Sequence, residues 1–207
     1  MSAAAAAPPV PLVARLADVA LGLTALGWAA REVLSGRALT LVGATLGGVN
    51  LVAGLLFLLR RQPERSAGPG ASALCMLSVG ASGVVLALAP APELWSWAAR
   101  GTFLGGAIVA VGSLLVLGRS FGVMPAVRGL VRAGPYRLVR HPVYLGELVM
   151  VLGAALAARS PAGWGAAALG LTLVVVRIVI EERLLAAGEA YREYQAEVRS
   201  RLLPGVW

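Results

Sequence analysis

The chain has 207 residues, of which 58% are hydrophobic and 14% are charged, and its formal net charge is +8. This apolar share exceeds that of soluble domains and indicates an integral membrane protein. The positive charge comes from arginines in loops beside apolar segments, so we assign it to a membrane surface and expect no nucleic-acid partner. One cysteine and one histidine exclude a disulfide within the chain and argue against a metal site.

Six apolar segments approach the length of about 20 residues that a bilayer span requires. They cover residues 12–30, 38–59, 71–91, 97–117, 144–158 and 162–180. Only three residues separate the short fifth segment from the sixth, so we expect these two to form a helical hairpin. The sequence therefore predicts an all-α, polytopic membrane helix bundle with about 5–6 transmembrane helices and a cytoplasmic C-terminal helix. Within this one membrane domain, we expect residues 1–118 to form N-terminal transmembrane helices and residues 119–207 a catalytic and cofactor-binding region.

Arginines gather in alternate loops and indicate the orientation of the chain. They concentrate between segments two and three, between segments four and five, and after segment six. By the positive-inside rule these regions face the cytoplasm, together with both termini. We therefore expect a multi-pass protein of a bacterial inner membrane whose active site faces the cytoplasm.

The stretch Gly134–Gly146, GPYRLVRHPVYLG, is the densest polar region beside an apolar segment and contains the only histidine, His141. Pro142 suits the first turn of a helix, so we expect a helix to start there. The N-terminal end of that helix then faces Arg140 and His141, which is a favourable place for an anion. The alternative interpretation is that the arginines bind lipid phosphates at the interface.

A second polar group lies at the end of the sixth segment. Arg177 and Glu181 are four residues apart and share one helix face, and Glu182 follows. Arg177 lies within an apolar run, where an ionisable group faces protein or a watery cavity. A simple Arg177–Glu181 pair is the structural alternative, but it leaves Glu182 unexplained. Glu147, one turn into the preceding helix, is expected to partner a nearby arginine.

The remaining C-terminal residues, 187–207, are amphipathic and mixed in charge. We expect one helix here that ends before Pro204. Two interpretations remain open: the helix lies on the membrane surface, or it covers a cytoplasmic pocket as a lid.

Several separated motifs resemble the isoprenylcysteine carboxyl methyltransferase family, whose superfamily includes phospholipid N-methyltransferases and thiol methyltransferases. From Arg119-x-Phe121 onward the chain carries, in order, Gly134-Pro135-Tyr136, Arg140-His141-Pro142-x-Tyr144-x-Gly146, Glu181-Glu182 with Leu184 and Leu185, Tyr191-x-x-Tyr194-x-x-x-Val198, and Leu203-Pro204. The first hundred residues resemble the family only as apolar spans.

The resemblance implies S-adenosylmethionine as the methyl donor, bound at the cytoplasmic side of the last helices. It makes Tyr136, Arg140, His141, Pro142, Tyr144, Gly146, Glu181 and Glu182 candidate cofactor-binding residues. The cofactor's amino acid end is zwitterionic, so the glutamates suit its ammonium, and Arg140, His141 and the helix N-terminus suit its carboxylate. Tyr136 and Tyr144 suit the adenine or the sulfonium.

The resemblance also implies a lipophilic acceptor that reaches the site from the membrane, and we take Arg177 and Glu181 as the candidate catalytic residues. Arg177 suits an acceptor carboxylate, whereas a glutamate suits an acceptor amine, so a carboxylate, an amine and a thiol all remain open. The partners are this lipophilic substrate and the membrane lipids. Two functions of another class also remain: a membrane reductase that uses NADPH, and a non-catalytic protein that binds anionic lipid.

Overall fold

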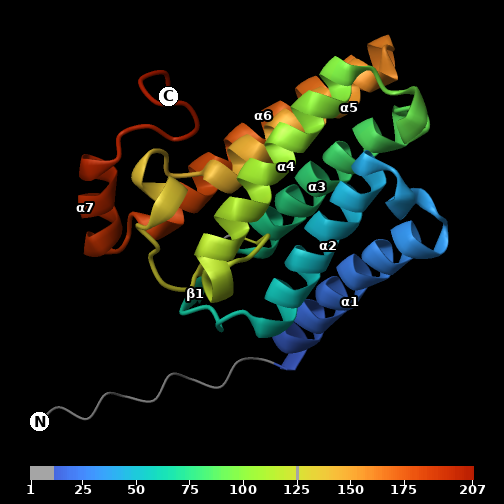
Figure 1. The fold of residues 1–207 in the computed structure, drawn as a ribbon. Helices are drawn as coiled ribbons and strands as arrows, with labels where there is room; N and C mark the ends of the chain where they lie inside the picture. The colour runs from blue at the N-terminus through green and yellow to red at the C-terminus, as the bar shows by residue number, and fades with distance from the viewer. Residues whose placement is uncertain (1–11, 125) are drawn as a thin grey trace, which may run out of the picture.

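The computed structural model describes residues 12–124 and 126–207, so residues 1–11 of the predicted N-terminal region lie outside it. The described chain is helical, and its helices run alternately up and down in one bundle (Figure 1). This confirms the all-α prediction. The α-helices are α1 (Leu12–Leu34), α2 (Leu41–Leu59), α3 (Pro69–Leu88), α4 (Trp97–Leu117), α5 (Pro142–Ala158), α6 (Pro161–Leu185) and α7 (Glu189–Glu197).

The starts of the long helices follow from their local sequence. The side chains of Thr40, Ser96 and Ser160 each accept a hydrogen bond from a backbone N–H in the first turn of α2, α4 and α6. Prolines stand in the first turn of α3, α5 and α6, where the missing N–H has no intrahelical partner to lose. The predicted start of a helix at Pro142 is confirmed, and so is the hairpin of α5 and α6.

In the described part of the chain, four helices are long and apolar enough to cross a membrane: α2, α3, α4 with the turn after it, and α6. Helix α5 is apolar but has only 17 residues, which reach about 26 Å along the helix axis. Helix α1 has 23 residues but carries charges at both ends. The protein is therefore a multi-pass membrane protein. Helices α1 and α5 differ from the four spans, because α1 is more charged and α5 is shorter.

Helices α4 and α5 form the closest helix pair, and glycines make this approach possible. A Cβ atom on Gly146 would lie 2.4 Å from the backbone nitrogen of Ala110, and one on Gly153 would lie 2.6 Å from that of Phe103. Small residues allow such backbone contact between helices in lipid. The crossing fixes the first turns of α5, which carry the polar residues, against α4.

Helices α2 and α3 follow one another in the chain but hardly touch. Helix α3 packs mainly on α6, whereas α2 packs on α1 and α4. The side of the bundle between α2 and α3 is therefore not closed by direct contact between these two helices.

The loops at the arginine-rich end are tied together by a short antiparallel ladder. Strands β1 (Arg65–Ser66) and β2 (Ala126–Val127) pair, and the Arg61 N–H donates to the carbonyl of Arg119 over 2.7 Å. The α2–α3 loop thereby holds the long α4–α5 loop against the end of the bundle.

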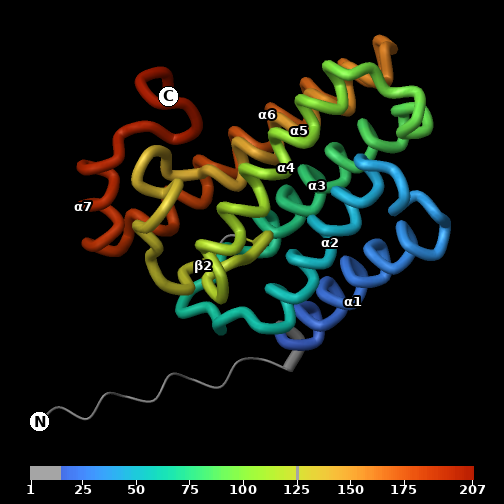
Figure 2. Tube along the Cα trace, viewed as in Figure 1, coloured from blue at the N-terminus to red at the C-terminus, as the bar shows by residue number. Residues whose placement is uncertain are grey.

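The C-terminal helix is shorter than predicted, because α7 ends at Glu197. The following carbonyls bind another part of the chain: Ser200 and Arg201 accept from the N–H groups of Arg140 and His141, at 3.0 and 2.9 Å. Residues 198–207 therefore form a folded tail, which lies beside the segment that leads into α5 (Figure 2).

Candidate active site

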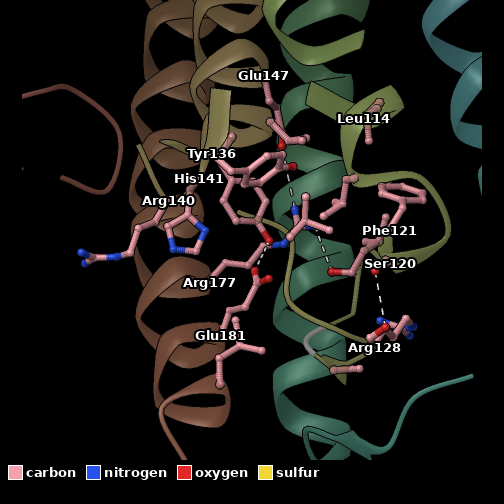
Figure 3. A pocket seen from close by; sticks show the side chains of 18 of the residues that line it. Leu114, Ser120, Phe121, Arg128, Tyr136, Arg140, His141, Glu147, Arg177 and Glu181 are labelled. Carbon is pink, nitrogen blue, oxygen red and sulfur yellow. Dashed lines mark hydrogen bonds and ion pairs between the residues drawn. The ribbon is translucent and has the colours of Figure 1, made fainter. Parts of the chain in front are cut away.

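A cavity of about 580 Å³ lies inside the arginine-rich end of the bundle and extends between the helices. Its volume falls in the range of small-molecule sites. One end is polar, and Figure 3 displays many of its side chains. The other end is an apolar arm lined by Val49 and Ala53 of α2, Val79 and Leu86 of α3, Phe103 of α4, and Met150 of α5.

Glu182 is the centre of a buried charged network beside this cavity. One carboxylate oxygen accepts from Arg140 Nε at 2.7 Å and lies 3.2 Å from His141 Nε2, and the other accepts from Arg201 Nε at 2.8 Å. Arg140 Nη1 also donates to the carbonyls of Val198 and Arg199. The network joins the start of α5, the end of α6 and the C-terminal tail.

Tyr144 connects this network to the cavity. Its hydroxyl donates to Glu181 over 2.6 Å, and its ring stacks on His141 with 5.5 Å between the ring centroids. The guanidinium carbon of Arg177 lies 4.7 Å from the centroid of the same Tyr144 ring. Tyr144 thus holds three candidate site residues in a fixed relation to one another.

Arg177 is the most deeply buried cation of the site, with 3% of its surface exposed. Its Nη2 donates to the Val123 carbonyl at 2.9 Å, and its nearest carboxylate is Glu147, at 3.9 Å from Nη1. The predicted alternative pairing of Arg177 with Glu181 is not the one observed. Glu147 also accepts from Ser82 of α3 at 3.0 Å. Nε and Nη1 of Arg177 have no hydrogen-bond acceptor in the described chain.

Most of the residues proposed from the sequence line the same cavity. They are Tyr136, Arg140, His141, Tyr144, Arg177 and Glu181. Pro142, Gly146 and Glu182 are absent from the wall: Pro142 begins α5, Gly146 permits the contact with α4, and Glu182 binds the residues behind the wall. These three remain proposals as site residues, with an indirect role.

Helix α7 covers the polar end of the cavity, whose wall includes Tyr191 and Tyr194. The Tyr194 hydroxyl donates to the Tyr136 carbonyl at 2.6 Å. Burial raises the pKa of Tyr194 to about 12 and raises the pKa of Tyr136 well above its usual value, so both phenols stay protonated at neutral pH. Arg132 binds α7 from outside, through the Ala190 carbonyl and the exposed carboxylates of Glu193 and Glu197.

Sequence reasoning missed two arginines of the site, Arg128 and Arg201. Arg128 lines the cavity from the α4–α5 loop, and Arg201 binds Glu182 from the tail. Both were counted only as loop arginines that orient the chain. Their position depends on the β1–β2 ladder and on the folded tail, which no local pattern indicates.

The sequence also matches the model of a known protein family. Residues 94–193 match the family model of phospholipid methyltransferases. The match supports a membrane methyltransferase. It runs from the residues before α4 into α7 and includes every predicted site residue, so the resemblance noted in the sequence is confirmed.

Among solved structures, the fold is similar to that of a eukaryotic intramembrane Ras methyltransferase, isoprenylcysteine carboxyl methyltransferase. The identity is 18% and the TM-score 0.48, and the match covers 78% of this chain and 67% of that chain. No curated protein matches the sequence.

Proposed function

We propose that the protein is an S-adenosylmethionine-dependent methyltransferase that acts on a lipophilic acceptor in the membrane. The observation that carries this proposal is a cavity whose polar end contains Glu181, Tyr144 and His141 and whose other end is an apolar arm between α2 and α3. A polar cofactor and a lipid-like acceptor require these two environments side by side.

The polar end contains groups suited to each part of the cofactor. Glu181 suits the ammonium of the amino acid end, since its carboxylate faces the cavity and is held by the Tyr144 hydroxyl. The rings of Tyr136 and Tyr144 suit the adenine or the positively charged sulfur. When bound, S-adenosylmethionine would supply a methyl group carried by its sulfonium sulfur. Transfer of the methyl group to the acceptor turns the sulfonium into a neutral thioether, the leaving group.

Arg177 is placed to hold the head group of the acceptor. It lies where the polar end meets the apolar arm, and two of its nitrogens have no acceptor. A buried arginine with free N–H groups favours an acceptor that carries a carboxylate or another oxygen anion. The neighbouring Glu147 keeps an amine acceptor as a second candidate.

The other parts of the site align the two reactants and exclude water from the cavity. Methyl transfer depends on the alignment of the two reactants and on exclusion of water. Helix α7 and the α4–α5 loop cover the polar end, and lipid-facing helices surround the apolar arm. We place this end of the bundle on the cytoplasmic side, because its loops carry most of the arginines.

Calorimetric titration of the detergent-purified protein with S-adenosylhomocysteine and with NADPH tests the proposal. We expect saturable binding of S-adenosylhomocysteine alone. The Arg177→Ala variant should keep that binding, because Arg177 is assigned to the acceptor. Binding of NADPH without S-adenosylhomocysteine would instead support a reductase, and binding of neither would contradict the methyltransferase.

A further inference from the structure

Three arginines contribute to the cavity wall: Arg128, Arg140 and Arg177. Arg140 already binds Glu182 and two carbonyls of the tail. Its guanidinium points away from the other labelled side chains in Figure 3. The residue predicted to take the cofactor's carboxylate is therefore largely occupied by the protein itself.

Arg177 is also partly engaged, and it lies within the membrane helix α6. It has a carbonyl partner, a carboxylate at 3.9 Å and an aromatic ring. These contacts place it beside the apolar arm and suit it to the acceptor.

Arg128 is different, because it is a buried cation without a carboxylate partner. Only 6% of its surface is exposed, and none of the ion pairs formed among the described residues includes Arg128. Its Nε is buried with no acceptor, and Nη1 has only a long contact of 3.5 Å to the Met124 carbonyl. Burial of an uncompensated charge is unfavourable, so this position favours an anionic ligand.

The electrostatics of the cavity agree with this reading. Desolvation lowers the pKa of Arg128, and the field of the Glu181 carboxylate acts in the opposite direction. Both side chains line the cavity. A zwitterion bound there would meet one cationic wall and one anionic wall.

A glycine makes room for the Arg128 side chain. A Cβ atom at Gly122 would lie 2.3 Å from Nη1 of Arg128 and 2.8 Å from its Cζ. Any side chain at position 122 must therefore displace the guanidinium. Because only the end of a flexible side chain has to move, alanine at this position should still permit folding.

We propose that Arg128 binds the carboxylate of the methyl donor's amino acid end, while Glu181 binds its ammonium. The inference rests on the proposed function and identifies which residue of this chain recognises the acid group. A planar guanidinium matches a carboxylate through paired N–H groups. Arg140 and His141 then belong to the framework that supports the site.

A thermodynamic cycle tests the assignment. Competition titrations compare S-adenosylhomocysteine with its decarboxylated analogue, which keeps the ammonium, on the wild type and on Arg128→Gln. We expect the wild type to bind the carboxylate-bearing ligand ten- to a hundredfold more tightly, and Arg128→Gln to lose this preference. If the wild type shows no preference, or if Arg128→Gln retains it, the assignment is wrong.

Two further variants separate binding from folding. Gly122→Ala keeps every charge but displaces the guanidinium, so it should reduce the same preference. Arg137→Gln is the matched control, because it removes an exposed arginine of the same loop region and should leave the preference unchanged.

Arg128→Met should melt at or above the wild-type temperature without ligand, because it removes an unpaired buried charge. A large loss of stability would argue that Arg128 is structural.

Failure of the proposed function is distinguishable from failure of this inference. If the wild type does not bind S-adenosylhomocysteine, the methyltransferase proposal fails and this assignment fails with it. If the wild type binds it and the cycle shows no coupling to Arg128, only the assignment fails.

Discussion

At the scale of single residues, the two consecutive glutamates at the end of α6 have different surroundings. Glu181 lines the cavity and accepts one hydrogen bond from Tyr144. Glu182 is buried and is bound by Arg140, His141 and Arg201. Consecutive residues on a helix point about 100° apart, so one can face a ligand while the other faces the protein.

This difference predicts different consequences for the two conservative variants. Glu181→Gln should fold normally and bind S-adenosylhomocysteine about ten- to a hundredfold more weakly, since one charge-assisted hydrogen bond contributes about 1.5–3 kcal/mol. Glu182→Gln should lose about 3–5 kcal/mol of stability, because it strands buried cations. Thermal melts measured beside calorimetry distinguish the two; equal stability and equal binding loss in both variants would contradict the division.

The residues of the site could be found from the sequence where they lie at the ends of predicted apolar helices. His141, Tyr144 and Glu181 were identified because they flank helix ends that hydropathy locates well. Arg128 and Arg201 could not be found, because their role depends on long-range pairing of loops. The sequence predicted that Glu147 would partner a nearby arginine, and the structure identifies that arginine as Arg177; the sequence could not select Arg177, because Glu181 on the same helix was an equally plausible partner for it.

At the scale of helices, the α4–α5 crossing positions the site, because it fixes the start of α5. Gly146→Ala should destabilise the protein by about 1–3 kcal/mol, since the new Cβ atom meets helix backbone that cannot easily move. Gly105→Ala is the control: it lies on an exposed face of α4 with no atom within 4 Å of the added Cβ. Thermal unfolding in the same detergent compares them, and equal melting temperatures would contradict the packing role.

Arg132 binds the outer side of α7 through the Ala190 carbonyl and through exposed ion pairs to Glu193 and Glu197, in addition to the buried hydrogen bond between Tyr194 and Tyr136. Such pairs contribute about 0.2–1 kcal/mol each and are weakened by salt. Arg132→Gln should therefore increase amide hydrogen exchange in 189–197 while the exchange of α4 and α5 stays unchanged. Arg137→Gln should leave the amide exchange of α7 unchanged. An equal increase of exchange in both variants would mean that Arg132 does not hold α7 in place.

Helix existence was predictable from hydropathy, proline and capping residues, and α2 to α6 lie close to the predicted segments. The end of α7 was not predictable. Its amphipathic pattern continues past Glu197, but the carbonyls of Val198, Arg199, Ser200 and Arg201 bind the segment around Arg140 instead of continuing a helix. Tertiary hydrogen bonds here override local helix propensity.

For the molecule as a whole, the alternation of arginine-rich and arginine-poor loops predicts the orientation in the membrane. Single cysteines placed at Arg61, Glu93 and Arg137 in a Cys75→Ala background should report it, since all three positions are exposed. A membrane-impermeant thiol reagent should label the Glu93 position from outside and the other two only after the membrane is opened. Labelling of the Glu93 position from the cytoplasmic side would overturn this topology.

A structure of the protein with bound S-adenosylhomocysteine tests the proposed methyl-donor site most directly. We predict that the ligand lies in the cavity beneath α7, in contact with Glu181, Tyr144 and Arg128, and that the apolar arm between α2 and α3 leads from it. A ligand bound at another surface, or one that borders neither Glu181 nor Tyr144, would contradict the assignment of this cavity as the methyl-donor site.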